Sequence, residues 1–304
     1  MENEDYEGAE KDFTIAIGKN PENINAYRER ASARFNLREY EKAIEDYKIV
    51  LENIPNDTTV LSDMGTANYN LRNYYEAISS YTKAISLDST YYRNFKLRGE
   101  SKYNLDDYDG AREDLNMTYK LIEEENSMRQ QKAEIYYYLG AIENQLKNYK
   151  KVIEYMNTAV EFYNSGPIYN DKYKDDIYFN LAYAQRKLNQ DSAALVNYTK
   201  VIEIDDSYSS AYNNRGLIKR DNEDLYGAID DFTNAIEESF SFSGQLNAEP
   251  GALSFDSTSL GLYYNNRGIT KEKLGDKEGA CDDWSKGKSY NHSSATSNYR
   301  RKCN

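Results

Sequence analysis

Residues 211–238 read AYNNRGLIKRDNEDLYGAIDDFTNAIEE and contain two short amphipathic segments separated by a polar connection. In the first segment, Tyr212 and Gly216 lie four residues apart, which places them on one face of a helix. In the second, Ala228 and Phe232 have the same spacing and form an apolar stripe that can pack against that face. Because Gly216 has no side chain, the two helices can approach closely. The stretch therefore predicts an antiparallel helical hairpin with a tight turn.

The same pattern recurs along the chain in three columns of residues. The small residue of the first helix is Ala31, Gly65, Gly99, Gly140, Ala182, Gly216 and Gly268. The short apolar residue of the second helix is Ala43, Ala77, Ala111, Val152, Ala194, Ala228 and Ala280. The large residue of the second helix is Tyr47, Tyr81, Leu115, Met156, Tyr198, Phe232 and Trp284. In every column the successive spacings are 34, 34, 41, 42, 34 and 52, so the base period is 34 and the additions of 7, 8 and 18 residues fall between hairpins.

A helix-turn-helix unit with this period, an aromatic residue, a glycine or alanine, a second alanine and a large apolar residue resembles the tetratricopeptide repeat. Proline, which often closes such units, is present as Pro21 and Pro55 but is absent from the matching positions of the other units. The resemblance covers nearly all of the chain. It implies an all-α fold, a right-handed superhelical solenoid of helical hairpins, whose first helices line a concave groove that receives partner segments.

We therefore expect a single tetratricopeptide solenoid over residues 1–304, with a half-repeat helix at 5–20 and a C-terminal tail at 295–304 that caps the last hairpin. The predicted repeats are 24–57, 58–91, 92–125, 133–166, 175–208, 209–242 and 261–294. The half-repeat fits two explanations. Either it caps the array, or the chain has lost upstream residues, including any export signal.

Three interruptions separate the predicted repeats. Residues 121–131 read LIEEENSMRQQ, and we expect them to extend the second helix of the third repeat. Residues 165–176 read SGPIYNDKYKDD, and their Gly-Pro step predicts a loop. Residues 243–260 read SGQLNAEPGALSFDSTSL, a composition that argues against a regular helix. They predict a surface loop or, alternatively, a lid that covers the groove with Leu253 and Phe255.

The charge of the chain limits its partners. Lysine and arginine total 38 against 51 aspartates and glutamates, a formal charge of −13, which argues against nucleic acid and favours a basic or neutral protein or peptide. No apolar run approaches the roughly 18 to 20 residues that a transmembrane helix needs. The N-terminus, MENEDYEGAE, is acidic where a signal peptide would be basic and then apolar. The expected location is cytoplasmic as given, or exported or periplasmic if an N-terminal signal has been removed. The oligomeric state is not indicated.

Catalytic and metal-binding patterns are missing from the sequence. His292 is the single histidine, so histidine-dependent triads and multi-histidine metal sites are not expected, and we take this residue as a solvated loop residue. We therefore expect no enzyme activity, no cofactor and no metal. Cys281 and Cys303 are either two reduced thiols, as in a cytosolic protein, or a bridge that ties down the cap in an exported one.

Function then depends on a surface, and one column of the groove suggests where. The position two before the small first-helix residue is Glu29, Asp63, Leu97, Tyr138, Asn180, Asn214 and Asn266. An amide side chain offers both a donor and an acceptor, so the three asparagines can pair with the backbone of an extended peptide. Some peptide-binding members of the resembling family use such a ladder. The alternative is that these asparagines are ordinary polar residues of a helix surface.

Aromatic residues form a second stripe on the predicted first helices. Phe35, Tyr69 and Tyr103 are 34 residues apart, and Phe179 and Tyr183 lie on the inner face of the fifth repeat. Together with the Tyr138 of the groove column they can stack on a ligand, or they can serve as packing between helices.

The sequence thus favours a non-catalytic scaffold for protein–protein interaction that binds a peptide segment or a protein partner in the concave groove. The alternative is a structural subunit of a cell-envelope assembly, which would use convex or edge surfaces.

Overall fold

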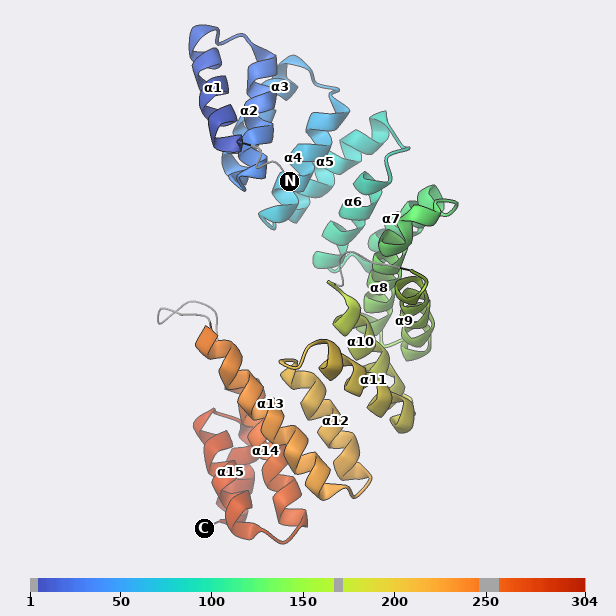
Figure 1. Ribbon diagram of the computed structural model, residues 1–304, viewed down its shortest axis with the longest axis vertical. Helices are drawn as coiled ribbons and strands as arrows, with labels where there is room; N and C mark the ends of the chain where they lie inside the picture. The colour runs from blue at the N-terminus through green and yellow to red at the C-terminus, as the bar shows by residue number, and fades with distance from the viewer. Residues whose placement is uncertain (1–4, 167–171, 246–256, 304) are drawn as a thin grey trace. The chain divides into compact units, whose positions relative to one another are not determined.

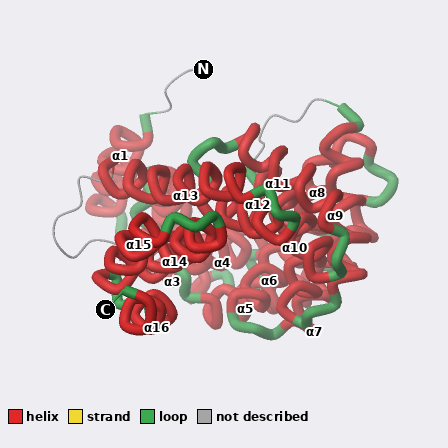
Figure 2. The backbone as a smooth tube through the Cα atoms, turned by 90° about the horizontal axis from the view of Figure 1, so that it is seen from below, coloured by secondary structure: helices red, strands yellow, loops and turns green. Residues whose placement is uncertain are grey.

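The computed structural model describes residues 5–166, 172–245 and 257–303. These residues form α-helices and one short 3-10 helix, without a strand among them, so the predicted all-α fold is confirmed. Helices and short loops alternate along the chain (Figures 1 and 2). The chain divides into two compact units, residues 1–142 and 143–304. That the repeats form one continuous solenoid stays a prediction.

The first unit begins with the single helix α1, and paired helices follow it. The helices are α1 (Tyr6–Lys19), α2 (Ile24–Asn36), α3 (Tyr40–Asn53), α4 (Thr58–Asn70), α5 (Tyr74–Leu87), α6 (Tyr92–Asn104), α7 (Tyr108–Ile122), the 3-10 helix η1 (Asn126–Met128) and α8 (Arg129–Gln145), which runs across the division. α2 packs on α3, α4 on α5 and α6 on α7 as hairpins, and each hairpin also packs on the helix before it. The first helices that the sequence predicts are therefore α2, α4, α6 and α8.

The second unit repeats this arrangement. Its helices are α9 (Tyr149–Asn164), α10 (Lys174–Lys187), α11 (Asp191–Ile204), α12 (Ser209–Asp221), α13 (Leu225–Gln245), α14 (Ser257–Lys273), α15 (Lys277–Ser289) and α16 (Ser293–Lys302). α10 pairs with α11, α12 with α13 and α14 with α15.

Each hairpin turn is closed by one residue in the left-handed region of the backbone. These residues are Arg38, Arg72, Asp106, Lys147, Asn189, Glu223 and Gly275, with φ between 57° and 91°. They follow the spacings of the three sequence columns. In the first hairpin the backbone N–H of Glu39, just after the left-handed residue, donates to the carbonyl of Arg34, which satisfies a helix-end carbonyl. The turns therefore have the same geometry although six of the seven lack the glycine that this conformation favours.

The core is built from the three columns that the sequence predicts. The large residues of the second helices, from Tyr47 to Trp284, are all at most 2% exposed. They face the small residues of the first helices. A Cβ on Gly65 would lie 2.7 Å from a ring carbon of Tyr81, and one on Gly268 would lie 2.8 Å from Trp284 Nε1. A small residue opposite a large one thus sets the separation of the two helices in a hairpin.

Within the described residues, a buried charge network braces four of the seven hairpins. In each, an arginine of the first helix makes a two-point ion pair with a buried aspartate of the second, and a basic residue four positions later contacts the same aspartate. The groups are Arg30, Arg34 and Asp46; Arg98, Lys102 and Asp114; Arg215, Lys219 and Asp231; and Arg267, Lys271 and Asp283. The arginines also donate to a threonine of the preceding second helix, as Arg30 does to Thr14 at 3.3 Å. Each network therefore ties its hairpin to the one before it.

Two expectations about the interruptions are wrong in part. Residues 121–131 do not extend α7, which ends at Ile122; a turn and η1 follow, and the added residues lengthen the start of α8 instead. The predicted irregular segment 243–260 is helical at both ends, because α13 continues to Gln245 and α14 begins at Ser257. Its centre, with Leu253 and Phe255, lies outside the described residues, as do residues 167–171 of the other predicted loop.

The C-terminal segment is a helix, α16, that packs on α14 and α15. His292 is not a solvated loop residue as expected: it precedes α16, and its Nδ1 accepts a hydrogen bond from the backbone N–H of Ala295 at 3.3 Å. Partial burial lowers the pKa of His292. A disulfide joins Cys281 of α15 to Cys303, with 5.6 Å between their Cα atoms. Of the two thiol states that the sequence left open, the structure has the bridge.

Candidate functional site

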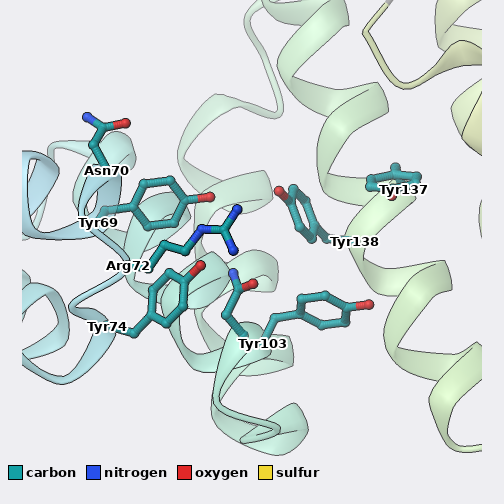
Figure 3. A pocket seen from close by; sticks show the side chains of 8 residues that line it. Tyr69, Asn70, Arg72, Tyr74, Tyr103, Tyr137 and Tyr138 are labelled. Carbon is teal, nitrogen blue, oxygen red and sulfur yellow. The ribbon is translucent and has the colours of Figure 1, made fainter. Parts of the chain in front are cut away.

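Three first helices of the first unit, α4, α6 and α8, contribute aromatic residues to one pocket, shown in Figure 3. We call it the tyrosine pocket, and its volume is about 320 Å³. Its lining residues are Tyr69, Asn70, Arg72, Tyr74, Tyr103, Asn104, Tyr137 and Tyr138. Three predicted site residues, Tyr69, Tyr103 and Tyr138, are thereby brought together from separate repeats.

Edge-on ring contacts hold the tyrosines in place. The ring of Tyr103 meets that of Tyr138 at a centroid distance of 5.7 Å, and the ring of Tyr69 meets that of Tyr74 at 5.9 Å. Such offset or edge-to-face geometry is the favoured one for aromatic pairs. The side chain of Arg72 extends between Tyr69 and Tyr74 toward Tyr138 (Figure 3). The pocket therefore presents aromatic faces whose orientation is fixed by packing.

A buried acid lies behind the tyrosine pocket. The hydroxyl of Tyr69 donates to Glu100 Oε2 at 2.9 Å, and Lys96 bridges Glu100 and Glu134. Burial raises the pKa of Glu100, against the attraction of Lys96, which lowers it. Both the hydrogen bond and the ion pairs position the Tyr69 ring, so the pocket wall is built on a polar network inside the unit.

A second hollow of about 250 Å³ lies between the N-terminal halves of α4 and α6. We call it the acidic pocket, and it is lined by Thr58, Thr59, Ser62, Asp63, Asp88, Tyr91 and Asn94. Burial, with a smaller contribution from Asp57, raises the pKa of Asp63 to about 6. Hydrogen bonds from Thr90 lower the pKa of Asp88, which is exposed. Asp63 belongs to the predicted groove column, so the column passes through this pocket.

The three predicted asparagines are engaged within the second unit. Asn266 is buried and donates to Asn213 Oδ1 at 2.8 Å, whereas Asn214 accepts from Asn213 at 3.2 Å. Asn180 accepts from Asn144 at 3.1 Å. The expectation that all three occupy exposed polar positions is therefore wrong for Asn266, because a shared register does not give shared exposure when the adjoining helices differ. Their role in binding a peptide stays a prediction.

The other predicted aromatic residues make ring contacts within their own units. Phe35 meets Tyr40 edge-on at 5.4 Å, outside the tyrosine pocket. Phe179 stacks on Tyr208 at 5.1 Å. Tyr183 meets Tyr149 at 6.2 Å, and Lys187 lies 5.0 Å from the centre of its ring. These contacts are the packing alternative that the sequence left open, and a binding role for the three residues stays a prediction.

Several residues of the two pockets were missed by the sequence reasoning. Arg72 lies in a hairpin turn, Tyr74 begins α5, and Tyr137 precedes the groove column by one residue. Asn94 had a usable signal, since it is a polar residue in a column that is otherwise mostly apolar. Among residues 5–166, 172–245 and 257–303, no group of three or more His, Cys, Asp or Glu side chains could hold a metal ion. In these same ranges, every helix is too short or too polar to cross a membrane.

Comparison with protein families finds the tetratricopeptide repeat. Family models of that description match residues 1–58, and residues 59–91 and 175–208. Among curated proteins, none matches the sequence. The matched segments fall in both compact units, and each contains the hairpin columns described above.

Solved structures share the fold at low sequence identity. The C-terminal part of a TPR repeat-containing protein from Cytophaga hutchinsonii has a TM-score of 0.64 and 15% identity, with 88% of this chain and 97% of that chain covered. A tetratricopeptide repeat protein from Parabacteroides merdae has a TM-score of 0.57 and 18% identity, with 92% and 99% covered. YrrB, described as a TPR protein with an unusual peptide-binding site, has a TM-score of 0.50 and 18% identity, with 63% and 91% covered. At these identities the similarity shows the fold.

Proposed function

The chain is a tetratricopeptide repeat protein, and from this premise we propose that it is a non-catalytic scaffold that holds a peptide segment or protein partner against the first helices of its first unit. Repeats of this family generally serve protein–protein interaction. The observation that carries the proposal is the tyrosine pocket, because α4, α6 and α8 each supply tyrosine to one hollow.

Tyrosine suits this role for a physical reason. Its ring offers a large contact area with few rotatable bonds, and its hydroxyl can exchange hydrogen bonds with a partner. Asn70 and Asn104 add amide groups at the rim, where each side chain is anchored to a backbone carbonyl of its own helix, at 3.0 and 2.8 Å. Fixed rings and anchored amides reduce the conformational entropy that binding would otherwise lose.

The repeat supplies a matched test of this site. Asn36, Asn70 and Asn104 are equivalent exposed residues, each with its amide on the carbonyl four residues earlier, but Asn36 lies outside the pocket. A photo-crosslinking amino acid at position 70 or 104 should capture one discrete protein, whereas the same residue at position 36 should not. Equal capture at all three positions would contradict the proposal.

A charge reversal tests the same surface by affinity. Arg72→Glu changes a pocket residue, and Arg38→Glu changes the equivalent left-handed turn residue outside the pocket. Once the partner is identified, Arg72→Glu should change the dissociation constant by at least about five-fold, a shift of about 1 kcal/mol, and Arg38→Glu by less than two-fold. Both variants should melt like the parent, because exposed turn residues contribute little to packing.

A second candidate is a structural subunit of a cell-envelope assembly, with an exported location. It is favoured by the bridge between Cys281 and Cys303, since disulfides persist in oxidising compartments and are rare in the cytosol. Thiol titration of unfolded protein that was isolated without reductant should find no free thiol. Two free thiols in protein from its native host would remove the support for export and leave the cytoplasmic location.

A further inference from the structure

The acidic pocket differs from the tyrosine pocket in its chemistry. Its walls are the first turns of α4 and α6 and the end of α5, and they expose one carboxylate on each side, Asp63 and Asp88. Three hydroxyl residues of α4, Thr58, Thr59 and Ser62, complete that wall. Oxygen acceptors therefore dominate the lining.

The carboxylate of Asp63 has no hydrogen-bond donor among the described residues. In the described part of the chain, no side chain or backbone group donates a hydrogen bond to its carboxylate, and no cation is within ion-pair distance of it. On the neighbouring repeat, Arg28 is paired with Asp57. Burial accordingly raises the pKa of Asp63 to about 6. A half-buried carboxylate without a partner is a costly group, and it is explained if a donor from outside completes it.

The charges around Asp63 come from every helix packed near it. Asp57 precedes α4, and Tyr47 of α3 and Tyr81 of α5 both interact with the Asp63 charge, which contributes to raising their pKa after the larger effect of burial. Asp88 lies at the end of α5. On α6, a hydrogen bond to Tyr91 raises the pKa of the exposed Arg93. The charges of Arg28 and Asp57 offset each other. Of the other charges, the two carboxylates Asp63 and Asp88 outnumber the single arginine, Arg93, so the pocket keeps a net negative charge.

Asn94 is the second independent sign of a binding site. It is 3% exposed, lines the pocket, and has no side-chain hydrogen bond within the described residues. The equivalent residues of the other repeats are Ala26, Val60, Ile135, Ile177, Ala211 and Tyr263. A buried amide thus replaces an apolar or aromatic residue at this repeat alone. An amide that lines a pocket and has no partner within the described residues can accept a hydrogen bond from a ligand there.

These groups select the chemistry of the ligand. A carboxylate, an amide oxygen and several hydroxyls together accept hydrogen bonds from a planar guanidinium or an ammonium group. A metal ion is a poorer fit, because no group of three carboxylate, His or Cys side chains converges in the described ranges. The volume of about 250 Å³ also leaves room for a side chain.

We propose that the acidic pocket receives a basic side chain, arginine or lysine, of the segment that binds along the first helices; this rests on the proposed function. Asp63 pairs with the positive group, and Asn94 accepts one of its N–H bonds. On α4, Asp63 precedes the tyrosine-pocket residue Tyr69 by six positions, about 9 Å along the helix axis. An extended peptide covers this distance in about three residues. The basic residue of the bound peptide therefore lies about three positions from the peptide residue that occupies the tyrosine pocket.

The test uses a small probe and needs no knowledge of the partner. Capped arginine, N-acetyl-arginine amide, is titrated into the full-length protein while the side-chain amide resonances of Asn94 are followed by NMR. N-acetyl-citrulline amide has nearly the same shape without the charge. We expect a saturable shift of the Asn94 resonance with arginine and at least ten-fold weaker binding with citrulline. Equal shifts with both probes, or none with arginine, would overturn the assignment.

Two variants identify the group that binds the probe. Asp63→Asn removes the pocket carboxylate, and Glu29→Gln removes the exposed acid at the same repeat position outside the pocket. Asp63→Asn should weaken arginine binding at least ten-fold and Glu29→Gln less than two-fold. Arginine binding should also weaken about ten-fold from pH 7 to pH 5, because a carboxyl with a pKa of about 6 is mostly ionised at the first pH and mostly protonated at the second. An unchanged affinity in Asp63→Asn would overturn the assignment even if the probe binds.

The two proposals can fail separately. If position 70 or 104 captures a partner and the arginine probe does not bind, the scaffold function stands and the basic side chain is excluded. If the probe binds at Asp63 and no partner is captured, the pocket assignment stands as a site for a basic group and the scaffold function fails.

Discussion

The hairpins α2–α3 and α4–α5 are adjacent, equal in period and closed by the same left-handed turn, but they are held together differently. In α2–α3, Arg30 and Arg34 contact the buried Asp46 at 2.7 to 2.9 Å. At the same repeat positions, α4–α5 has Met64, Asn68 and Ser80. There the two polar residues bond only to backbone carbonyls one turn earlier, Asn68 to Met64 and Ser80 to Glu76. We call these the braced and the neutral hairpin.

The comparison separates the residues that build the hairpin, which both hairpins share, from the charge network, which only one of them has. Both hairpins keep the small and large columns, Ala31 with Tyr47 and Gly65 with Tyr81, and both form. The charge network is thus dispensable for the hairpin shape. The neutral hairpin is also the one whose α4 lines both the tyrosine pocket and the acidic pocket. α6, the first helix of the braced hairpin α6–α7, lines both pockets as well, so a charge network inside a hairpin does not exclude a role in a pocket.

Removing the central acid of the braced hairpin should give the largest effect. Asp46→Ala leaves Arg30 and Arg34 without their buried partner, which should reduce stability by about 3 to 5 kcal/mol. Ser80→Ala, the matched change in the neutral hairpin, should cost less than about 1 kcal/mol. Hydrogen exchange of the α2–α3 and α4–α5 amides measures each loss locally.

A combined variant sharpens this prediction. Arg30→Met, Arg34→Asn and Asp46→Ser together give the braced hairpin the residues of the neutral one. Since exchanging a whole buried ion network is often close to neutral, the triple variant should be more stable than Asp46→Ala alone. A triple variant as unstable as the single one would show that the network is required for the fold.

The neutral hairpin should gain stability when its unpaired acid is neutralised. The pKa of Asp63 is raised from about 3.8 to about 6, so the folded protein binds this proton more tightly than the unfolded chain. The stabilisation that this tighter proton binding gives to the folded protein is fully present below pH 3.8 and is lost as the pH rises through 6. At pH 7, Asp63→Asn should therefore raise the free energy of unfolding by about 1 to 3 kcal/mol. Urea unfolding at pH 4 and pH 7 measures it, and a destabilised variant at pH 7 would contradict the assigned burial.

A hydrogen-bonded but uncharged hairpin should fall between the two. In α10–α11 the same columns hold Leu181, Gln185 and Asn197, and the Asn197 amide donates to Gln185 Oε1 at 2.8 Å. Asn197→Ala leaves the buried Gln185 unpaired and should cost about 1 to 2 kcal/mol. Hydrogen exchange of the α10–α11 amides should show less loss than Asp46→Ala causes in α2–α3; an equal loss would mean that charge adds nothing to these networks.

The fold was readable from the sequence because its determinants are local and repeated. The spacings that align Gly216 with Ala228 and Phe232 also place the left-handed turn residues, although these were not identified beforehand. Where the 34-residue period is interrupted, the sequence predicted the ends of helices less accurately. Residues 121–131 are rich in helix formers, yet the helix ends at Ile122 and begins again at Arg129, with Asn126 and Ser127 in the short 3-10 helix between them.

The candidate site was only partly readable for a related reason. Tyr69, Tyr103 and Tyr138 were identified as stripe and column residues, but Arg72 and Tyr137 reach the pocket through side-chain directions that spacing does not specify. Likewise Asn214 and Asn266 share a column, and only Asn266 is buried, because its neighbour is Asn213 of the preceding first helix.

By itself the sequence determined the helical hairpin, its period and its core columns, since these depend on residue type and on spacing within one unit. Only the tertiary structure decided which tyrosines line one pocket, that Asp63 and Asn94 lack side-chain partners within the described residues, and that Cys281 meets Cys303. Such contacts depend on the distance and rotation between consecutive hairpins, which are set by side-chain volumes on both faces together and not by any one position in the repeat.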